Sequence, residues 1–210
     1  MEGDFISALD EFFCAKYADY NRLSGIEGYR VPDLIEIGRD GNVIRRDAEV
    51  MKLCRQENAK EILINFKAGL ADMEFTFNFS FVPFFERVKD KFRKYTFHKL
   101  LPAVLARVDE TVQSAGEKLD IDPKIWKGIV KGKLYPEKNT IFALAIVCHL
   151  SLADTTDLLS VCGFAFEDQN VRDVIVEYVL TQKIFNENMR DRCLQEYKID
   201  TLPIKRAKAL

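Results

Sequence analysis

Five lysines between residues 124 and 138 have the type and spacing to do chemistry. Lys124, Lys127 and Lys131 recur at helical spacing and are expected to share one outward face, which Lys133 and Lys138 extend. Such a face can bind phosphate groups, because each ammonium carries a positive charge and three N–H donors. The face lacks Arg, Asn and Gln, the side chains that form paired hydrogen bonds with base edges. The lysines therefore predict phosphate binding with little sequence selectivity.

A basic helical face is also typical of an ordinary surface helix. The whole chain has a net charge of −2, which does not indicate a nucleic-acid partner. The positive charge is local, because residues 96–140 carry eight basic and six acidic side chains. Both interpretations, a phosphate-binding face and a solvated face, stay open on the sequence.

The residues that usually carry catalysis or metal binding form no recognisable set. His98 and His149 have no partner at metal-ligand spacing, and the five cysteines are widely spaced. Gly38 and Gly41 fit a turn better than a phosphate-binding loop. We therefore expect no catalytic residues, no metal and no cofactor. An enzyme activity of unfamiliar type within residues 1–95 remains the alternative.

The composition indicates a globular, non-membrane protein. Of the 210 residues, 48% are hydrophobic, which is enough for a substantial core. No apolar run reaches the roughly 18 residues of a membrane span. The first residues are acidic where a secretory signal would be basic, and the odd cysteine number favours reduced thiols. These features predict a cytoplasmic location.

The first part of the chain is expected to mix helices and strands. An apolar rhythm predicts a helix over 4–23, and Leu34–Ile37 is expected to pair with Val43–Arg46 in a hairpin. A short helix is expected over 47–56. Residues 61–69 fit either a helix or a strand, and the strand pattern that follows favours a strand.

Four phenylalanines give the clearest strand signal. Phe75, Phe77, Phe79 and Phe81 alternate with polar residues, which predicts a strand with one apolar and one wet face. The apolar face is expected to cover a core. If that core is incomplete, the same face becomes a partner surface.

From residue 96 the pattern is helical. Helices are expected over 96–108, 112–119, 122–131, 139–150, 152–162, 170–180 and 186–197. Pro102 implies either that the first of these begins near Leu101 or that it is kinked. Residues 86–95 are expected to form an exposed, basic, helical connector between two domains.

The order of these helices resembles the lambda-repressor/Cro-like DNA-binding domains. The resemblance rests on Ala115, the turn Asp120–Asp122, Gly132 with Pro136, and the apolar run Thr140–Ile146. Residues 96–200 are also similar to a helical C-terminal module that some bacterial proteins carry after unrelated domains such as macrodomains. That similarity rests on Thr96-Phe97, Ile121–Lys124, Lys138–Ile146, Asp157–Leu159, Gly163-Phe164 and Ile175–Tyr178. Pro102 and Gly116 depart from the pattern.

The predicted fold class is α+β. It comprises an α+β domain over 1–85 with a small antiparallel sheet, a connector over 86–95, an all-α helix-turn-helix domain over 96–200, and a loose tail over 201–210. The resemblance implies a transcriptional regulator that binds double-stranded DNA as a homodimer, with the N-terminal domain sensing a signal or dimerising. The alternative is a non-enzymatic adaptor, for example in a bacterial defence or toxin-type system, that docks on a protein partner.

Overall fold

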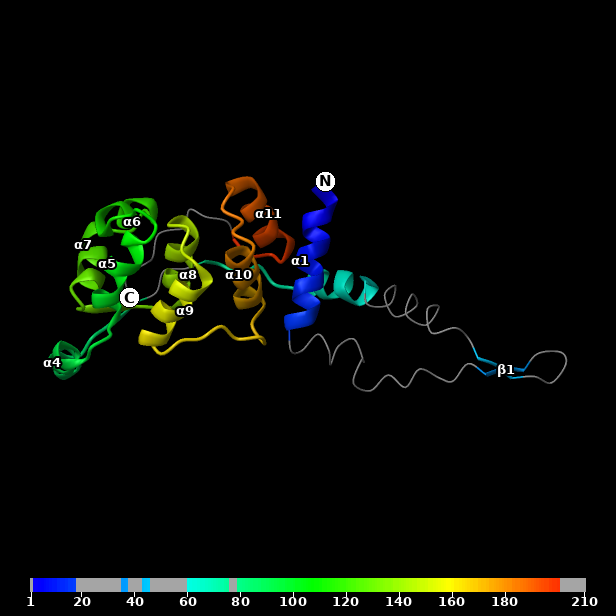
Figure 1. The fold of residues 1–210 in the computed structure, drawn as a ribbon, viewed down its shortest axis with the longest axis horizontal. Coiled ribbons are helices and arrows are strands. Elements are labelled where there is room, and N and C mark those ends of the chain that lie inside the picture. The colour runs from blue at the N-terminus through cyan, green and yellow to red at the C-terminus, as the bar shows by residue number, and fades with distance from the viewer. Residues whose placement is uncertain (1, 18–34, 38–42, 46–59, 76–78, 201–210) are drawn as a thin grey trace.

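The structure, a computed structural model, describes residues 2–17, 35–37, 43–45, 60–75 and 79–200. Helices dominate these residues, and the strands form two separate two-stranded antiparallel sheets (Figure 1). A mostly helical fold with small antiparallel sheets is therefore confirmed. The predicted helix over 47–56 and the tail over 201–210 lie outside the described residues.

The N-terminal helix α1 (Glu2–Lys16) packs along α10 (Val171–Thr181). Leu9 and Phe13 are fully buried one turn apart, which is the spacing that predicted this helix. The ring centroid of Phe13 lies 4.6 Å from that of Tyr197, near the other end of the sequence. The helix is thus confirmed as far as Lys16, and residues 18–34 are not described.

The predicted hairpin is confirmed. Strand β1 (Ile35–Ile37) pairs antiparallel with β2 (Val43–Arg45), with Ile35 opposite Arg45. The turn between them lies outside the described residues. In Figure 1 these two strands lie apart from the helices.

The strand favoured for residues 61–69 is wrong, because residues 60–69 are helical. Leu63 is buried and Phe66 packs on the ring of Phe13, with 5.6 Å between the centroids. Lys67 donates to Asp10 at 2.6 Å and to Glu196 at 2.8 Å. Packing against α1 and α11 (Glu187–Glu196) selects the helix where the local pattern was ambiguous.

The expectation of one phenylalanine face over a core is also wrong. Strand β3 covers only Phe79–Phe81, and it pairs with β4 (Leu134–Pro136) from the C-terminal half, with Phe81 opposite Leu134. Phe75 is 2% exposed, whereas Phe81 is 77% exposed. A two-stranded sheet with no helix over Phe81 cannot bury it. Phe77 lies outside the described residues.

The helices expected after residue 96 are confirmed, with ends within a few residues of the expectation. They are α5 (Phe97–Ala106), α6 (Val112–Lys118), α7 (Pro123–Val130), α8 (Lys138–Val147) and α9 (Leu152–Val161), followed by α10 and α11. Pro102 lies inside α5, so the start near Leu101 is excluded. Residues 141–146 of α8 are all buried, which makes α8 central.

One hydrophobic cluster runs from Leu9 to Ile199. It includes Leu63 and Phe75 together with the buried faces of α5, α8 and α10. The described part of residues 1–85 therefore shares its core with the C-terminal helices. The predicted boundaries at 85, 95 and 200 stay predictions.

Candidate nucleic-acid interface

The lysines lie on α7 or after it, and α7 packs against the preceding helix α6. Thr111 and Ser114 form a reciprocal capping box at the start of α6, with hydrogen bonds of 2.9 and 3.0 Å. Asp122 accepts from the main-chain N–H groups of Lys124 and Ile125 at the start of α7. Pro123 occupies the first turn of α7, where its missing N–H removes no intrahelical bond. The tight connection between the helices fixes their relative position.

Trp126 anchors α7 on α6. Its indole Nε1 donates to the main-chain oxygen of Val112 at 2.7 Å, and its ring lies against Gly116. A Cβ at Gly116 would lie 2.5 Å from the indole, so only glycine allows this contact. The glycine at 116 therefore has a packing reason. Trp126 and Ile129 are buried on one side of α7, so the opposite side of the helix faces solvent.

Four of the five predicted lysines are exposed and one is not. Lys124, Lys127, Lys131 and Lys133 are exposed, and none has an acidic partner within 4 Å in the described part of the chain. The Lys138 side chain is 16% exposed and forms ion pairs with Asp173 and Glu167. The positive charge of Lys138 is thus neutralised by carboxylates of the same protein. We call the first four side chains the lysine face.

A second exposed surface was not expected from the sequence. Helix α4 (Phe84–Phe92), which Figure 1 shows at the edge of the helices beyond α7, exposes apolar side chains to solvent. The exposed aromatic residues there are Phe81, Phe84, Phe85, Phe92 and Tyr95, and Phe92 is 87% exposed. We call them the aromatic face. The signal was present as apolar residues at i, i+1, i+4 and i+8 in 84–92, within what was expected to be a basic connector.

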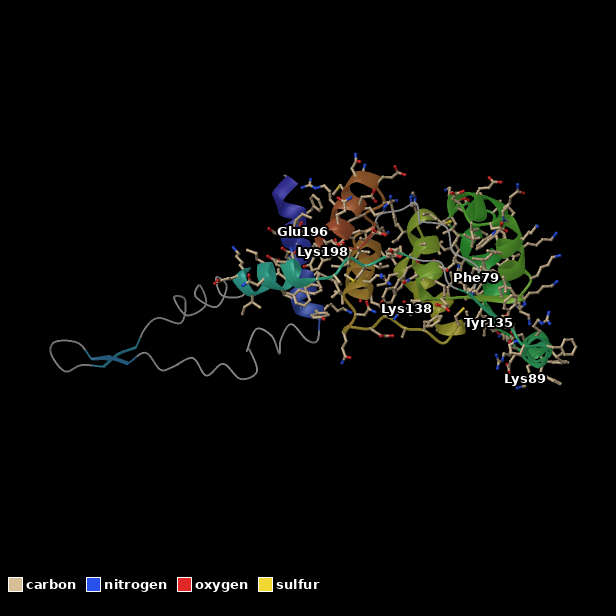
Figure 2. The ribbon with its side chains drawn as sticks, turned by 180° about the vertical axis from the view of Figure 1, so that it is seen from behind. Phe79, Lys89, Tyr135, Lys138, Glu196 and Lys198 are labelled. Atoms are coloured by element: carbon tan, nitrogen blue, oxygen red, sulfur yellow. The ribbon has the colours of Figure 1, made fainter. Side chains whose placement is uncertain are left out.

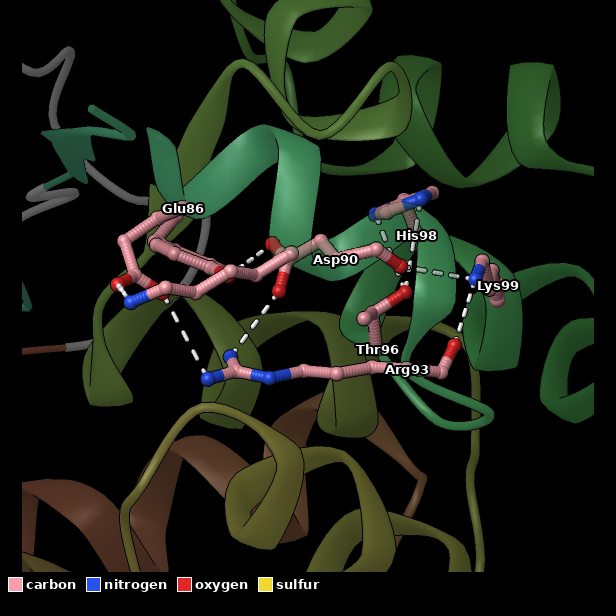
Figure 3. Close-up of polar contacts among 8 residues, drawn as sticks. Glu86, Asp90, Arg93, Thr96, His98 and Lys99 are labelled. Atoms are coloured by element: carbon pink, nitrogen blue, oxygen red, sulfur yellow. Dashed lines mark hydrogen bonds and ion pairs between the residues drawn. The ribbon is translucent and has the colours of Figure 1, made fainter. Parts of the chain in front are cut away.

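Asp90 attaches α4 to the rest of the protein, although α4 projects outward. Asp90 is 2% exposed. Its carboxylate accepts a hydrogen bond from the Arg93 guanidinium at 3.0 Å (Figure 3) and another from the Tyr135 hydroxyl. Burial and the bond to Asp90 raise the pKa of Tyr135 to about 12. Lys99 donates to the main-chain oxygens of Asp90 and Arg93 at 2.9 and 2.6 Å. Figure 2 places Tyr135 beside Phe79 at the β3–β4 pair, and Lys89 farther out on α4.

Two hollows adjoin these surfaces. A groove of about 860 Å³ between α6 and α7 is lined mainly by apolar side chains, Trp126 and Ile121 among them. A pocket of about 340 Å³ lies between α4 and the end of α7. The pocket is lined by Phe84, Arg87, Val88, Asp90, His98, Lys131, Gly132 and Lys133.

His98 forms one wall of the smaller pocket. Its imidazole Nδ1 is 3.3 Å from the Thr96 hydroxyl, and its ring lies against Gly132, whose φ is +64°. Burial lowers the pKa of His98, and the nearby Lys99 lowers it further. Near neutral pH the imidazole is therefore uncharged, and the positive charge of the pocket comes from Arg87, Lys131 and Lys133.

Within the described residues no helix is long and apolar enough to cross a bilayer. In the same residues, His, Cys, Asp and Glu side chains do not cluster in threes in a way that would hold a metal ion. Searches of protein-family models, curated proteins and solved structures find no match to this chain.

Proposed function

We propose that this protein binds double-stranded DNA through the lysine face of α7, in the role of a transcriptional regulator. The observation that carries the proposal is that Lys124, Lys127, Lys131 and Lys133 are exposed on or directly after one capped helix, with no acidic partner in the described residues. Four unneutralised ammonium groups on a rigid surface favour contact with a phosphate backbone.

The helix pair α6–α7 supports the same proposal. A helix held by its neighbour at a tight turn is the arrangement by which helix-turn-helix proteins present one helix to the major groove. Lysines without Arg, Asn or Gln beside them supply affinity more than base selectivity. A regulator of this kind reads two half-sites, so the proposal includes a homodimer.

The test is DNA binding measured at several salt concentrations. The full-length protein is mixed with fluorescent duplex fragments, and binding is followed by anisotropy. With four phosphate contacts, we expect the logarithm of the binding constant to fall with the logarithm of salt with a slope of about −3 to −4. The variant Lys124→Glu/Lys127→Glu/Lys131→Glu is expected to lose binding at every salt concentration.

The matched control changes the same number of charges elsewhere. Lys60→Glu, Lys94→Glu and Lys183→Glu change exposed lysines away from α7 and are expected to leave the salt slope unchanged. Binding of the α7 variant with wild-type affinity, or no binding by wild type at low salt, would refute the proposal.

The aromatic face favours a second function, that of an adaptor. Five exposed aromatic side chains gather on β3, on α4 and at Tyr95, a density typical of interaction sites. This surface replaces the row of Phe75, Phe77, Phe79 and Phe81, which the sequence favoured as core and offered as a partner surface only in the alternative. Retention of a protein partner by the α7 variant, and its loss from a Phe85→Ser/Phe92→Ser variant, would favour the adaptor.

A further inference from the structure

The pocket between α4 and the end of α7 has more positive than negative charge. Arg87, Lys131 and Lys133 line it, and none of the three has an acidic partner within 4 Å among the described residues. The one carboxylate in the lining, that of Asp90, already binds Arg93 and the Tyr135 hydroxyl. The three cations are therefore not neutralised by the pocket itself.

Arg87 adds a second, independent observation. Its Nε is buried and makes no hydrogen bond, a condition that only Arg172 shares among the described side chains. The guanidinium lies 5.7 Å from the centroid of the Phe84 ring, which holds it at the pocket wall. A buried donor without an acceptor is costly, and an anion in the pocket would place an acceptor beside a guanidinium that has no acidic partner within 4 Å among the described residues.

We propose that this pocket binds a phosphate group. A planar guanidinium beside two ammonium groups matches the charge and the several acceptor oxygens of phosphate. The volume of about 340 Å³ is at the lower end of the range for small-ligand sites. The phosphate belongs either to a free small molecule or to the 5′ end of a nucleic-acid strand, and both present the same chemistry.

The proposal goes beyond duplex binding by the lysine face. Lys131 and Lys133 belong to both sites, but Arg87 and His98 belong to the pocket alone, and Lys124 and Lys127 to the face alone. A Lys124→Glu/Lys127→Glu variant therefore removes half of the face without changing the pocket lining. The two proposals can fail separately.

The two histidines allow a direct test in the full-length protein. His98 lines the pocket, while His149 stacks on Phe185 with 4.5 Å between ring centroids. Their imidazole resonances are followed by NMR through a pH titration in inorganic phosphate and in chloride of the same ionic strength. We expect phosphate to shift the resonance of His98 and raise its pKa, because a bound anion favours the imidazolium. His149 is expected not to respond.

Variants tie the response to the pocket. Arg87→Gln and Lys133→Gln are each expected to weaken phosphate binding about tenfold or more, since each loses a hydrogen bond to a charged group. Lys94→Gln removes the same charge from a residue near α4 but outside the pocket lining, so it is expected to bind phosphate like wild type. Trp126 fluorescence, recorded for all three variants, checks that they are folded.

A second arm separates the two sources of phosphate. The same titration is run with a short duplex that carries or lacks 5′-phosphates. A His98 response to inorganic phosphate assigns the pocket to free ligands, and a response only to the 5′-phosphorylated duplex assigns it to strand ends. Either result supports the proposal. No response of His98 to any of them, or an equal response in Arg87→Gln, overturns it, whatever the lysine face does with DNA.

Discussion

Gly116 and Trp126 determine how closely α6 approaches α7. The indole occupies the space where any other residue at 116 would place its Cβ, and its N–H is satisfied by the main-chain oxygen of Val112. The lysine face depends on this contact, because Trp126 is the buried anchor of the same helix. Adding a single methyl group at residue 116 by the substitution Gly116→Ala therefore tests the close contact between α6 and α7.

We expect Gly116→Ala to destabilise the protein by about 1–3 kcal/mol through overpacking against the indole. Urea unfolding followed by Trp126 fluorescence measures this. Gly69→Ala is the control, because nothing lies within 4 Å of the added Cβ. That control is expected to be neutral or up to about 1 kcal/mol more stable, since alanine favours helices. Equal stabilities of the two variants would contradict the close contact.

Lys138 is expected to serve stability rather than DNA binding. It forms an ion pair with Asp173, which is 1% exposed and whose pKa is raised by burial. Lys138→Gln leaves that carboxylate without its cation and should cost about 3 kcal/mol near neutral pH. DNA affinity should stay nearly unchanged. Lys127→Gln should show the reverse, weaker DNA binding at wild-type stability.

The loss in Lys138→Gln should depend on pH. Because the folded-state pKa of Asp173 lies above its unfolded value, the folded protein binds that proton more tightly, and acidification favours folding at this site. A protonated Asp173 needs no cation. The difference in the free energy of unfolding between Lys138→Gln and wild type is thus largest at neutral pH. It shrinks as the pH falls through the folded-state pKa of Asp173. A constant difference between pH 8 and pH 5 would contradict this account.

At the scale of elements, α4 is the helix whose packing least resembles that of its neighbours. Its apolar side faces solvent, and it is held by Asp90 and by the preceding strand β3, which pairs with β4. The aromatic side chains therefore contribute little to folding. Phe85→Ser/Phe92→Ser is expected to change the free energy of unfolding by less than about 0.5 kcal/mol.

Two measurements complete this prediction. Binding of a hydrophobic dye should fall in Phe85→Ser/Phe92→Ser, because the exposed apolar area is smaller. Phe97→Ala, a change to a buried phenylalanine in the next helix, should instead cost about 3–5 kcal/mol. Strong destabilisation by the double serine change would show that the aromatic face is part of the core.

The helices after residue 96 could be predicted because their signals are local. Asp122 with Pro123, the cap at Asn170 and the apolar run of α8 each lie within one element. Three other features depend on partners far along the chain. They are the helix at 60–69, the pairing of β3 with β4, and the ion pair of Lys138 with Asp173. No periodicity reports such partners. The lysines were therefore found from sequence, while the pocket and the aromatic face were not.

At the scale of the whole molecule, α1 joins the first residues to the last helices. Phe13 is fully buried between Phe66 and Tyr197, and Tyr197 donates to Asp10 at 2.9 Å. The sole tryptophan, Trp126, lies in α7 and so reports on the α6–α7 helix pair. These positions allow a test of whether the predicted domains unfold separately.

We expect Phe13→Ala to cost about 3–5 kcal/mol. Because the hydrophobic cluster is continuous, the transition seen by Trp126 fluorescence should shift together with the helical signal in circular dichroism. A fluorescence transition that stays in place while part of the helical signal shifts would instead establish independent domains. Gln195→Ala, a change at an exposed side chain on α11, is the control and should move neither signal.

The pairing of β3 with β4 also constrains the order in which the molecule is assembled. The strands flank the segment from α4 to α7, so their hydrogen bonds form only after that whole segment has been synthesised. Contacts between residues far apart in sequence carry a loop-closure cost and form more slowly than local helices. During translation, helices α5 to α7 are thus available before the phosphate pocket is. The pocket is completed only once Pro136 has emerged and closed the strand pair.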